Sequence, residues 1–186
     1  MGVDLSPMSA SPTPIPGLWQ FSIKAVSDER GTVREFVRTS AFAAAGVAVP
    51  DRWTQINLTW TRRGAVRGLH GEAMTKLVGV ASGSAFGVYL DARTDSAAYG
   101  TVITIPLEVG TQVLVPAGVC NGFQATGPDG CEYLYCFDAE WEPGMTGVAV
   151  RPTDPALDIG WPLPIDPDRR EQISVKDATA PLFADL

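Results

Sequence analysis

Short segments in which apolar and polar residues alternate dominate this chain from Trp19 onward, and they constrain its fold more than any other feature. Gly, Pro, Asp and Asn separate the segments. Because successive side chains of a strand point to opposite faces, this period of two predicts half-buried β-strands joined by turns. The pattern favours an all-β fold, and a jelly-roll barrel fits the segments best.

The stretch QINLTW illustrates the alternation. Ile56, Leu58 and Trp60 share one face, which we expect to enter a core. Gln55 and Asn57 lie on the other face, where their amides can meet a ligand. The alternation therefore predicts a strand with one buried face and one polar face.

Four further stretches predict strands: AFGVYLDAR, TVITIPLE, TQVLVPAG and CEYLYCFDAEW. In the first of them, Phe86, Val88 and Leu90 form the apolar face. A single short helix is predicted over residues 39–47, because Gly46 stands where glycine commonly ends a helix.

A length of 186 residues fits one domain. Residues 1–16 are rich in Pro and Ser and have neither a basic leader nor an apolar h-region, so we expect a flexible tail and no secretory signal. Residues 17–186 form the predicted domain. Its last part, residues 162–186, is rich in proline and is expected to wrap the barrel as an extended or briefly helical segment.

The charge and the cysteines limit the classes of function. A net charge of −7 opposes nucleic-acid binding, which depends on many Lys and Arg contacts to phosphate. No apolar run approaches the roughly 18 residues of a membrane span. Three cysteines without an export signal predict reduced thiols and a cytoplasmic protein. An anionic ligand would then be held by a few local cations.

His70 is the only histidine of the chain, which limits the possible chemistry. Metal sites in barrels of this size usually take several histidines, so we expect no bound metal. No nucleophile elbow and no glycine-rich phosphate loop is present. Acid–base chemistry remains, because an unperturbed imidazole titrates near neutral pH. The glycines of RGLHG permit a bend that lets Arg67 and His70 reach one pocket.

Several motifs in order resemble one family. RRGAVRGLH with a following lysine, DERGTVREF, QIN, GSAFGVYLDAR, VPAGVCNGF, YLY, DPALDIGWPL and SVKDATAPLF resemble the dTDP-4-dehydrorhamnose 3,5-epimerases, the RmlC-like sugar epimerases of the cupin superfamily. The resemblance covers about residues 19–184. It implies a homodimeric jelly roll that needs no metal or other cofactor and that epimerises a nucleotide-linked 4-keto-6-deoxyhexose.

The resemblance also implies roles for individual residues. His70 resembles the general base and Asp177 the carboxylate that orients it, while Tyr135 resembles the acid on the opposite face of the sugar. Lys76 is the expected donor to the enolate oxygen, since a proton next to a ketone is too weakly acidic for imidazole alone. The positions that resemble substrate-binding residues are Arg30, Glu35, Gln55, Asn57, Arg67, Asn121, Trp141 and Lys176.

The chain also departs from the family pattern. The loop after His70 is short, Asn121 stands where a second histidine is common, and Gly87 replaces an aspartate. Trp141 replaces a tyrosine and Thr146 a glutamate. These changes leave open the substrate, the number of centres inverted, and two other hypotheses: a non-catalytic nucleotide-sugar-binding cupin and a related enzyme for another carbonyl compound.

Overall fold

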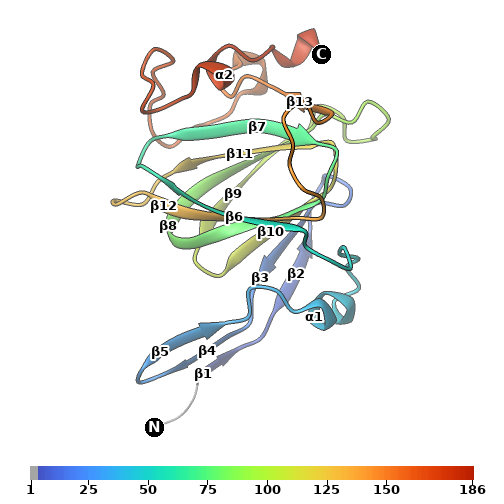
Figure 1. The fold of residues 1–186 in the computed structure, drawn as a ribbon, viewed down its shortest axis with the longest axis vertical. Coiled ribbons are helices and arrows are strands. Elements are labelled where there is room, and N and C mark those ends of the chain that lie inside the picture. The colour runs from blue at the N-terminus through green and yellow to red at the C-terminus, as the bar shows by residue number, and fades with distance from the viewer. Residues whose placement is uncertain (1–3) are drawn as a thin grey trace.

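The structure is a computed structural model that describes residues 4–186, and it consists mainly of antiparallel β-sheet (Figure 1). The strands are β1 (Asp4–Ser6), β2 (Ser9–Pro12), β3 (Trp19–Ser22), β4 (Ala25–Asp28), β5 (Gly31–Arg34), β6 (Gln55–Thr61), β7 (Val66–Glu72), β8 (Lys76–Asp91), β9 (Val102–Glu108), β10 (Thr111–Val115), β11 (Val119–Ala125), β12 (Cys131–Phe137) and β13 (Gly147–Ala149). The helices are α1 (Thr39–Ala44) and α2 (Val175–Ala178), and the 3-10 turns are η1 (Pro155–Leu157) and η2 (Phe183–Asp185). The predicted all-β class is confirmed.

Strand β8 belongs to both sheets of the barrel. Its first half pairs with β10 and β12, and its second half pairs with β9 and β11. Strand β6 extends the first sheet beyond β12, whereas β7 and β13 extend the second beyond β11. Strands β7 and β12 therefore belong to opposite walls of the barrel.

Two apolar clusters cover the two faces of the second sheet. Val88 and Leu90 face outward on β8, where Trp161 and Phe183 of the C-terminal segment pack over them. Tyr89, between these two residues, faces the interior of the barrel. Since both faces are covered, residues 87–91 of β8 are all buried. The C-terminal segment thus lies over the barrel wall that carries β7.

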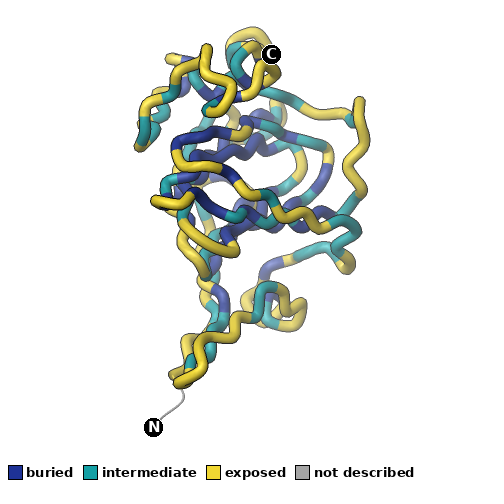
Figure 2. The backbone as a smooth tube through the Cα atoms, turned by 60° about the vertical axis from the view of Figure 1, so that its left-hand side comes forward, coloured by how far each residue is buried: buried dark blue, intermediate teal, exposed yellow. Residues whose placement is uncertain are grey.

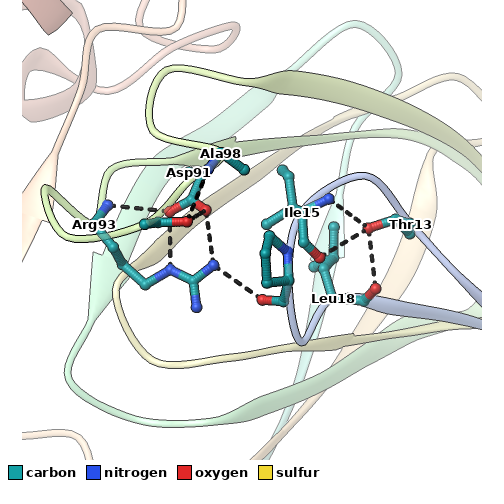
Figure 3. A network of polar contacts seen from close by, with 8 residues as sticks. Thr13, Ile15, Leu18, Asp91, Arg93 and Ala98 are labelled. Carbon is teal, nitrogen blue, oxygen red and sulfur yellow. Dashed lines mark hydrogen bonds and ion pairs between the residues drawn. The ribbon is translucent and has the colours of Figure 1, made fainter.

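The expectation of a flexible tail over residues 1–16 differs from the structure, although residues 1–3 lie outside the described residues. Strand β2 pairs with β3, and Ile15 is fully buried in the barrel core. Arg93 pairs with the buried Asp91 (Figure 3). Arg93 also donates to the Pro16 carbonyl at 2.9 Å. The high Pro and Ser content of this segment predicted a tail, although a few of its apolar residues dock into the core.

The small sheet β1–β4–β5 projects from the barrel beside α1 (Figure 1). Many of its residues are exposed, as Figure 2 shows. The helix predicted over residues 39–47 is confirmed for residues 39–44, and Gly46 follows it with a φ of 73°. None of the helices within residues 4–186 has the length and apolar character that a bilayer crossing requires.

The prediction that the apolar face of QINLTW enters the core is wrong for the single chain. Ile56, Leu58 and Trp60 are 60%, 56% and 57% exposed. The alternation is real, but among residues 4–186 strand β6 pairs only with β12, and no layer of these residues covers its apolar face. An exposed row of large apolar side chains marks a surface for association.

Replacing Ile15 with alanine tests whether the N-terminal segment is part of the core. We expect Ile15→Ala to lower the free energy of unfolding by about 2–5 kcal/mol, as is typical when a large aliphatic side chain is removed from a core. Urea unfolding measures the change. Leu5→Ala, at an exposed position of β1, is the control and should change stability by less than about 0.5 kcal/mol. Equal, small effects for both variants would contradict the docked arrangement.

Candidate active site

The site begins with a hydrogen bond between two residues that are far apart in the chain. His70 lies on β7, and its Nε2 is 2.7 Å from Oδ1 of Asp177 on α2. The Ser174 hydroxyl caps α2 by accepting a hydrogen bond from the Asp177 amide. Because an ionised carboxylate only accepts, Nε2 of His70 donates, and Nδ1 is left as the basic nitrogen.

The environment of Asp177 keeps it ionised. Burial by itself raises the pKa of this carboxyl group. The hydrogen bond and charge of His70, with the Ser174 cap, outweigh burial, so the pKa of Asp177 lies below its ordinary value. An ionised Asp177 fixes the imidazole and stabilises its cationic form, as a proton acceptor requires.

A cavity of about 490 Å³ opens beside this pair. His70, Asp177 and Tyr135 line it together with four cationic side chains, which are Arg62, Arg67, Arg170 and Lys176. The predicted local cations are thus concentrated at one place in an acidic protein. Planar guanidinium groups pair well with phosphate oxygens, so the cavity suits an anionic ligand.

Tyr135 lies on β12, in the wall opposite β7, and lines the same cavity as His70. Burial raises the pKa of Tyr135 far above its ordinary value, so the phenol stays protonated and can donate. Tyr133 shares its strand face but is fully buried and stacks on Phe123 with ring centroids 3.9 Å apart. Of these two tyrosines, Tyr135 is therefore the one that reaches the cavity.

Lys76, at the start of β8, is only 3% exposed. Its Nζ donates to Oδ1 of Asn121 at 2.7 Å, to the His70 carbonyl at 3.1 Å and to Oε2 of Glu72. Together with Tyr135, these side chains line a small adjoining cavity of about 50 Å³. The structure thus brings Lys76 and Asn121, two of the predicted site residues, into contact, whereas Glu72 was not anticipated.

Three other predicted binding residues, Gln55, Asn57 and Trp141, are joined by hydrogen bonds, and Trp141 is the one of them that lines a cavity. Gln55 donates from Nε2 to Oδ1 of Asn57 at 3.1 Å and accepts a hydrogen bond from the Trp141 amide at 2.7 Å. Trp141 lines a cavity of about 290 Å³, to which His70 and Lys176 also contribute. The indole is 45% exposed, so its face is available for stacking.

Arg30 and Glu35 do not join the site within the single chain. Arg30 is exposed between β4 and β5 and pairs with Asp28 at 2.6 Å. Glu35 pairs with Lys24 and Arg38 and lines a separate, mainly apolar cavity. Arg30 lies in the turn between β4 and β5 and Glu35 directly after β5, so the projecting sheet separates both from His70.

Packing explains one departure from the family pattern. A Cβ atom at Gly87 would lie 2.8 Å from the Tyr89 hydroxyl oxygen and 3.1 Å from Cδ1 of Leu107. The Tyr89 ring therefore occupies the space that a larger residue at position 87 would need. Asn121, which stands where a second histidine is common in the family, accepts a hydrogen bond from Lys76.

Sequence reasoning missed four contributors: Arg62, Glu72, Arg170 and Ser174. The two arginines stand in RRG and DRR, where a neighbouring arginine gives no sign of which side chain faces inward. Glu72 follows His70 by two residues, which places both on one strand face and could have identified it. No group of three or more His, Cys, Asp and Glu side chains suited to a metal occurs among residues 4–186.

The comparisons with known proteins agree on one family. The model of the dTDP-4-dehydrorhamnose 3,5-epimerases matches residues 12–185. The Mycobacterium tuberculosis dTDP-4-dehydrorhamnose 3,5-epimerase is 31% identical over 96% of this chain and 89% of its own, and a Streptomyces niveus dTDP-4-dehydrorhamnose 3-epimerase is 32% identical over 83% and 76%. The crystal structure of NovW, a 4-keto-6-deoxy sugar epimerase from Streptomyces spheroides, superposes with a TM-score of 0.85 at 30% identity, over 97% of this chain and 89% of that one.

The pH dependence of stability tests the His70–Asp177 pair. Because the pKa of Asp177 is lowered on folding, the pair stabilises the fold above the ordinary carboxyl pKa of about 4, and this contribution is lost as the pH falls through the folded-state value. Asp177→Asn should therefore cost about 1–3 kcal/mol of unfolding free energy at pH 6 and clearly less at pH 3. Urea unfolding of both proteins at each pH measures this. A cost that does not change with pH would contradict the ionised pair.

Proposed function

Since this chain belongs to the dTDP-4-dehydrorhamnose 3,5-epimerase family, we propose that it epimerises a nucleotide-linked 4-keto-6-deoxyhexose with His70 as base and Tyr135 as acid. The observation that carries the proposal is the placement of His70 and Tyr135. A base held by a carboxylate and a protonated phenol line one cavity from opposite walls of the barrel. A protein that only bound the sugar would need neither group.

In this mechanism His70 Nδ1 removes the proton from the carbon next to the ketone. Asp177 holds the imidazole in the required tautomer and stabilises the imidazolium that forms. General-base catalysis of this kind contributes about 10²–10⁴-fold to the rate. The proton must then be returned to the other face for the centre to invert.

Lys76 meets the electrostatic demand of this step. Negative charge moves to the ketone oxygen as the proton leaves, and a cationic donor aimed at that oxygen stabilises the enolate. The Lys76 ammonium lies next to the His70 backbone and shares a small cavity with Tyr135. Asn121 orients this ammonium by accepting one of its hydrogen bonds.

Tyr135 completes the inversion by donating its phenolic proton to the enolate carbon from the side opposite His70. Its raised pKa keeps the proton in place until a strongly basic carbanion forms. The location of the two groups on β12 and β7 supports delivery to opposite faces of the hexose. Proton removal alone would require only the base.

The rest of the cavity suits the nucleotide part of the substrate. Arg67 and Lys176 are available for the diphosphate, with Arg62 and Arg170 as additional cations. Gln55 and Asn57 can read hydroxyl or base edges, and Trp141 offers a stacking face. The relatives include 3,5-epimerases and a 3-epimerase, so C3 and C5 are the two candidate centres.

We further propose a cytoplasmic homodimer. The three cysteines are free and buried, which suits a reducing compartment. The exposed apolar face of β6 supports association with a second copy through a symmetric contact. In such a dimer the projecting sheet β1–β4–β5 would carry Arg30 and Glu35 to the partner subunit's cavity, which accounts for their distance from His70.

Two single variants test the roles of base and acid. His70→Ala should abolish uptake of solvent deuterium next to the ketone, whereas Tyr135→Phe should leave exchange and impair inversion. Proton NMR of the dTDP-4-keto sugar in heavy water measures both and shows whether C3, C5 or both exchange. Tyr133→Phe is the matched control, because the Tyr133 hydroxyl has no hydrogen-bond partner in the described structure. Full exchange by His70→Ala would exclude it as the base.

Mixed dimers test whether Arg30 acts in the partner's site. Neither Arg30→Ala nor His70→Ala alone should be active, but co-expression should restore epimerisation, because one site of each mixed dimer contains both native residues. Co-expression of His70→Ala with Asp177→Asn should restore nothing, since those two residues bond within one chain. Failure of the first mixture to regain activity would contradict the exchange of Arg30 between subunits.

A further inference from the structure

The three hydrogen-bond donors of Lys76 are all occupied. An ammonium group has three N–H donors, and the structure gives each one an acceptor: Glu72, Asn121 and the His70 carbonyl. The proposed enolate stabilisation requires one of these donors to point at the substrate. One of the three partners must therefore give way when a ketone oxygen arrives.

Glu72 is the least constrained of the three partners. The His70 carbonyl belongs to the backbone of β7, which β11 and β13 hold on both sides. Asn121 is 5% exposed on β11, between β7 and β8. The side chain of Glu72 is 21% exposed, at the last residue of β7.

A cavity beside Glu72 can receive the displaced side chain. This space of about 290 Å³ lies between Glu72, Trp141, Met145 and Gly147. The carboxylate is thus in contact with the small cavity that contains Lys76 on one side and with this larger one on the other. Rotation of one side chain would free a Lys76 donor without moving the barrel.

We propose that Glu72 is a positioning residue that pairs with the buried Lys76 before substrate binds and yields one N–H of Lys76 to the ketone oxygen of the bound sugar. The inference rests on the proposed role of Lys76. Glu72 gives the ammonium an anionic partner in a buried place, where an unpaired cation is costly. The ketone oxygen must compete with the Glu72 carboxylate for the Lys76 ammonium. The Glu72–Lys76 pair therefore favours a ligand whose oxygen can replace the carboxylate.

The charge of Glu72 supports its role as an ionised partner. Burial tends to raise the pKa of this carboxyl group, but the charge and hydrogen bond of Lys76 outweigh burial and leave it below its ordinary value. The carboxylate is therefore present near neutral pH. It would repel the negative charge of an enolate if it stayed beside Lys76, which is a second reason for it to leave during the reaction.

The test compares a ligand with a ketone and one without. Affinities of Glu72→Gln are measured by calorimetry in a His70→Ala background, where the sugar is not turned over. A neutral amide holds an ammonium more weakly than a carboxylate, so the dTDP-4-keto sugar should bind roughly fivefold to tenfold more tightly. Binding of dTDP, which has no hexose, should not change. Glu140→Gln, an exposed glutamate with the same change in charge, should alter neither affinity.

The outcomes separate this proposal from the proposed function. The exchange at Lys76 is overturned if Glu72→Gln leaves keto-sugar binding unchanged or weaker, or if it changes the affinity for both ligands equally. This conclusion holds whether or not the native enzyme turns the sugar over. An inactive native enzyme would overturn only the epimerase mechanism. Thermal unfolding confirms that Glu72→Gln is folded, and Glu72→Ala, which removes the acceptor altogether, must change the keto-sugar affinity in the same direction.

Discussion

Strand β8 is the element on which the geometry of this enzyme depends. Its sixteen residues pair with β10 and β12 in one half and with β9 and β11 in the other, so a single strand links both walls of the barrel. Ladder hydrogen bonds fix the strands on each side. As a result β7 carries His70 in one wall, β12 carries Tyr135 in the other, and β8 begins at Lys76 between them. An epimerase needs such separation, because a base and an acid on one face would return the proton to the side from which it came.

The same site has to keep charges in a partly buried place, and it does so by pairing them. Asp177 pairs with His70, and Glu72 pairs with Lys76. Asp177 lies on α2 and Glu72 at the end of β7, whereas His70 and Lys76 lie on β7 and β8. Each carboxylate therefore orients the functional group beside it as well as balancing its charge. The arginines around the cavity lie in a chain of net charge −7. Binding of a nucleotide diphosphate therefore depends on local arrangement and not on the overall charge.

The sequence predicted the strands and the chemistry better than it predicted which surfaces are buried. Alternation identified β6, but it could not tell that the described part of the chain leaves the apolar face of Ile56, Leu58 and Trp60 exposed. The composition of residues 1–16 predicted a tail. The two residues that dock this segment are the buried Ile15 and Pro16, whose carbonyl accepts a hydrogen bond from Arg93, and neither belongs to an alternating pattern. The motifs indicated His70 and Asp177, which bond across 107 residues. Glu72 escaped because its importance arises from a contact with Lys76, which only the folded chain reveals.

The proposed mechanism requires the hexose to lie between His70 and Tyr135. A crystal structure of the protein with a dTDP-hexose bound in the cavity would show its position. We expect Nδ1 of His70 and the Tyr135 hydroxyl on opposite faces of the sugar ring, each within contact distance of the carbon next to C4, and the O4 atom next to Lys76. A hexose bound with both groups on the same face, or outside the cavity, would contradict this mechanism.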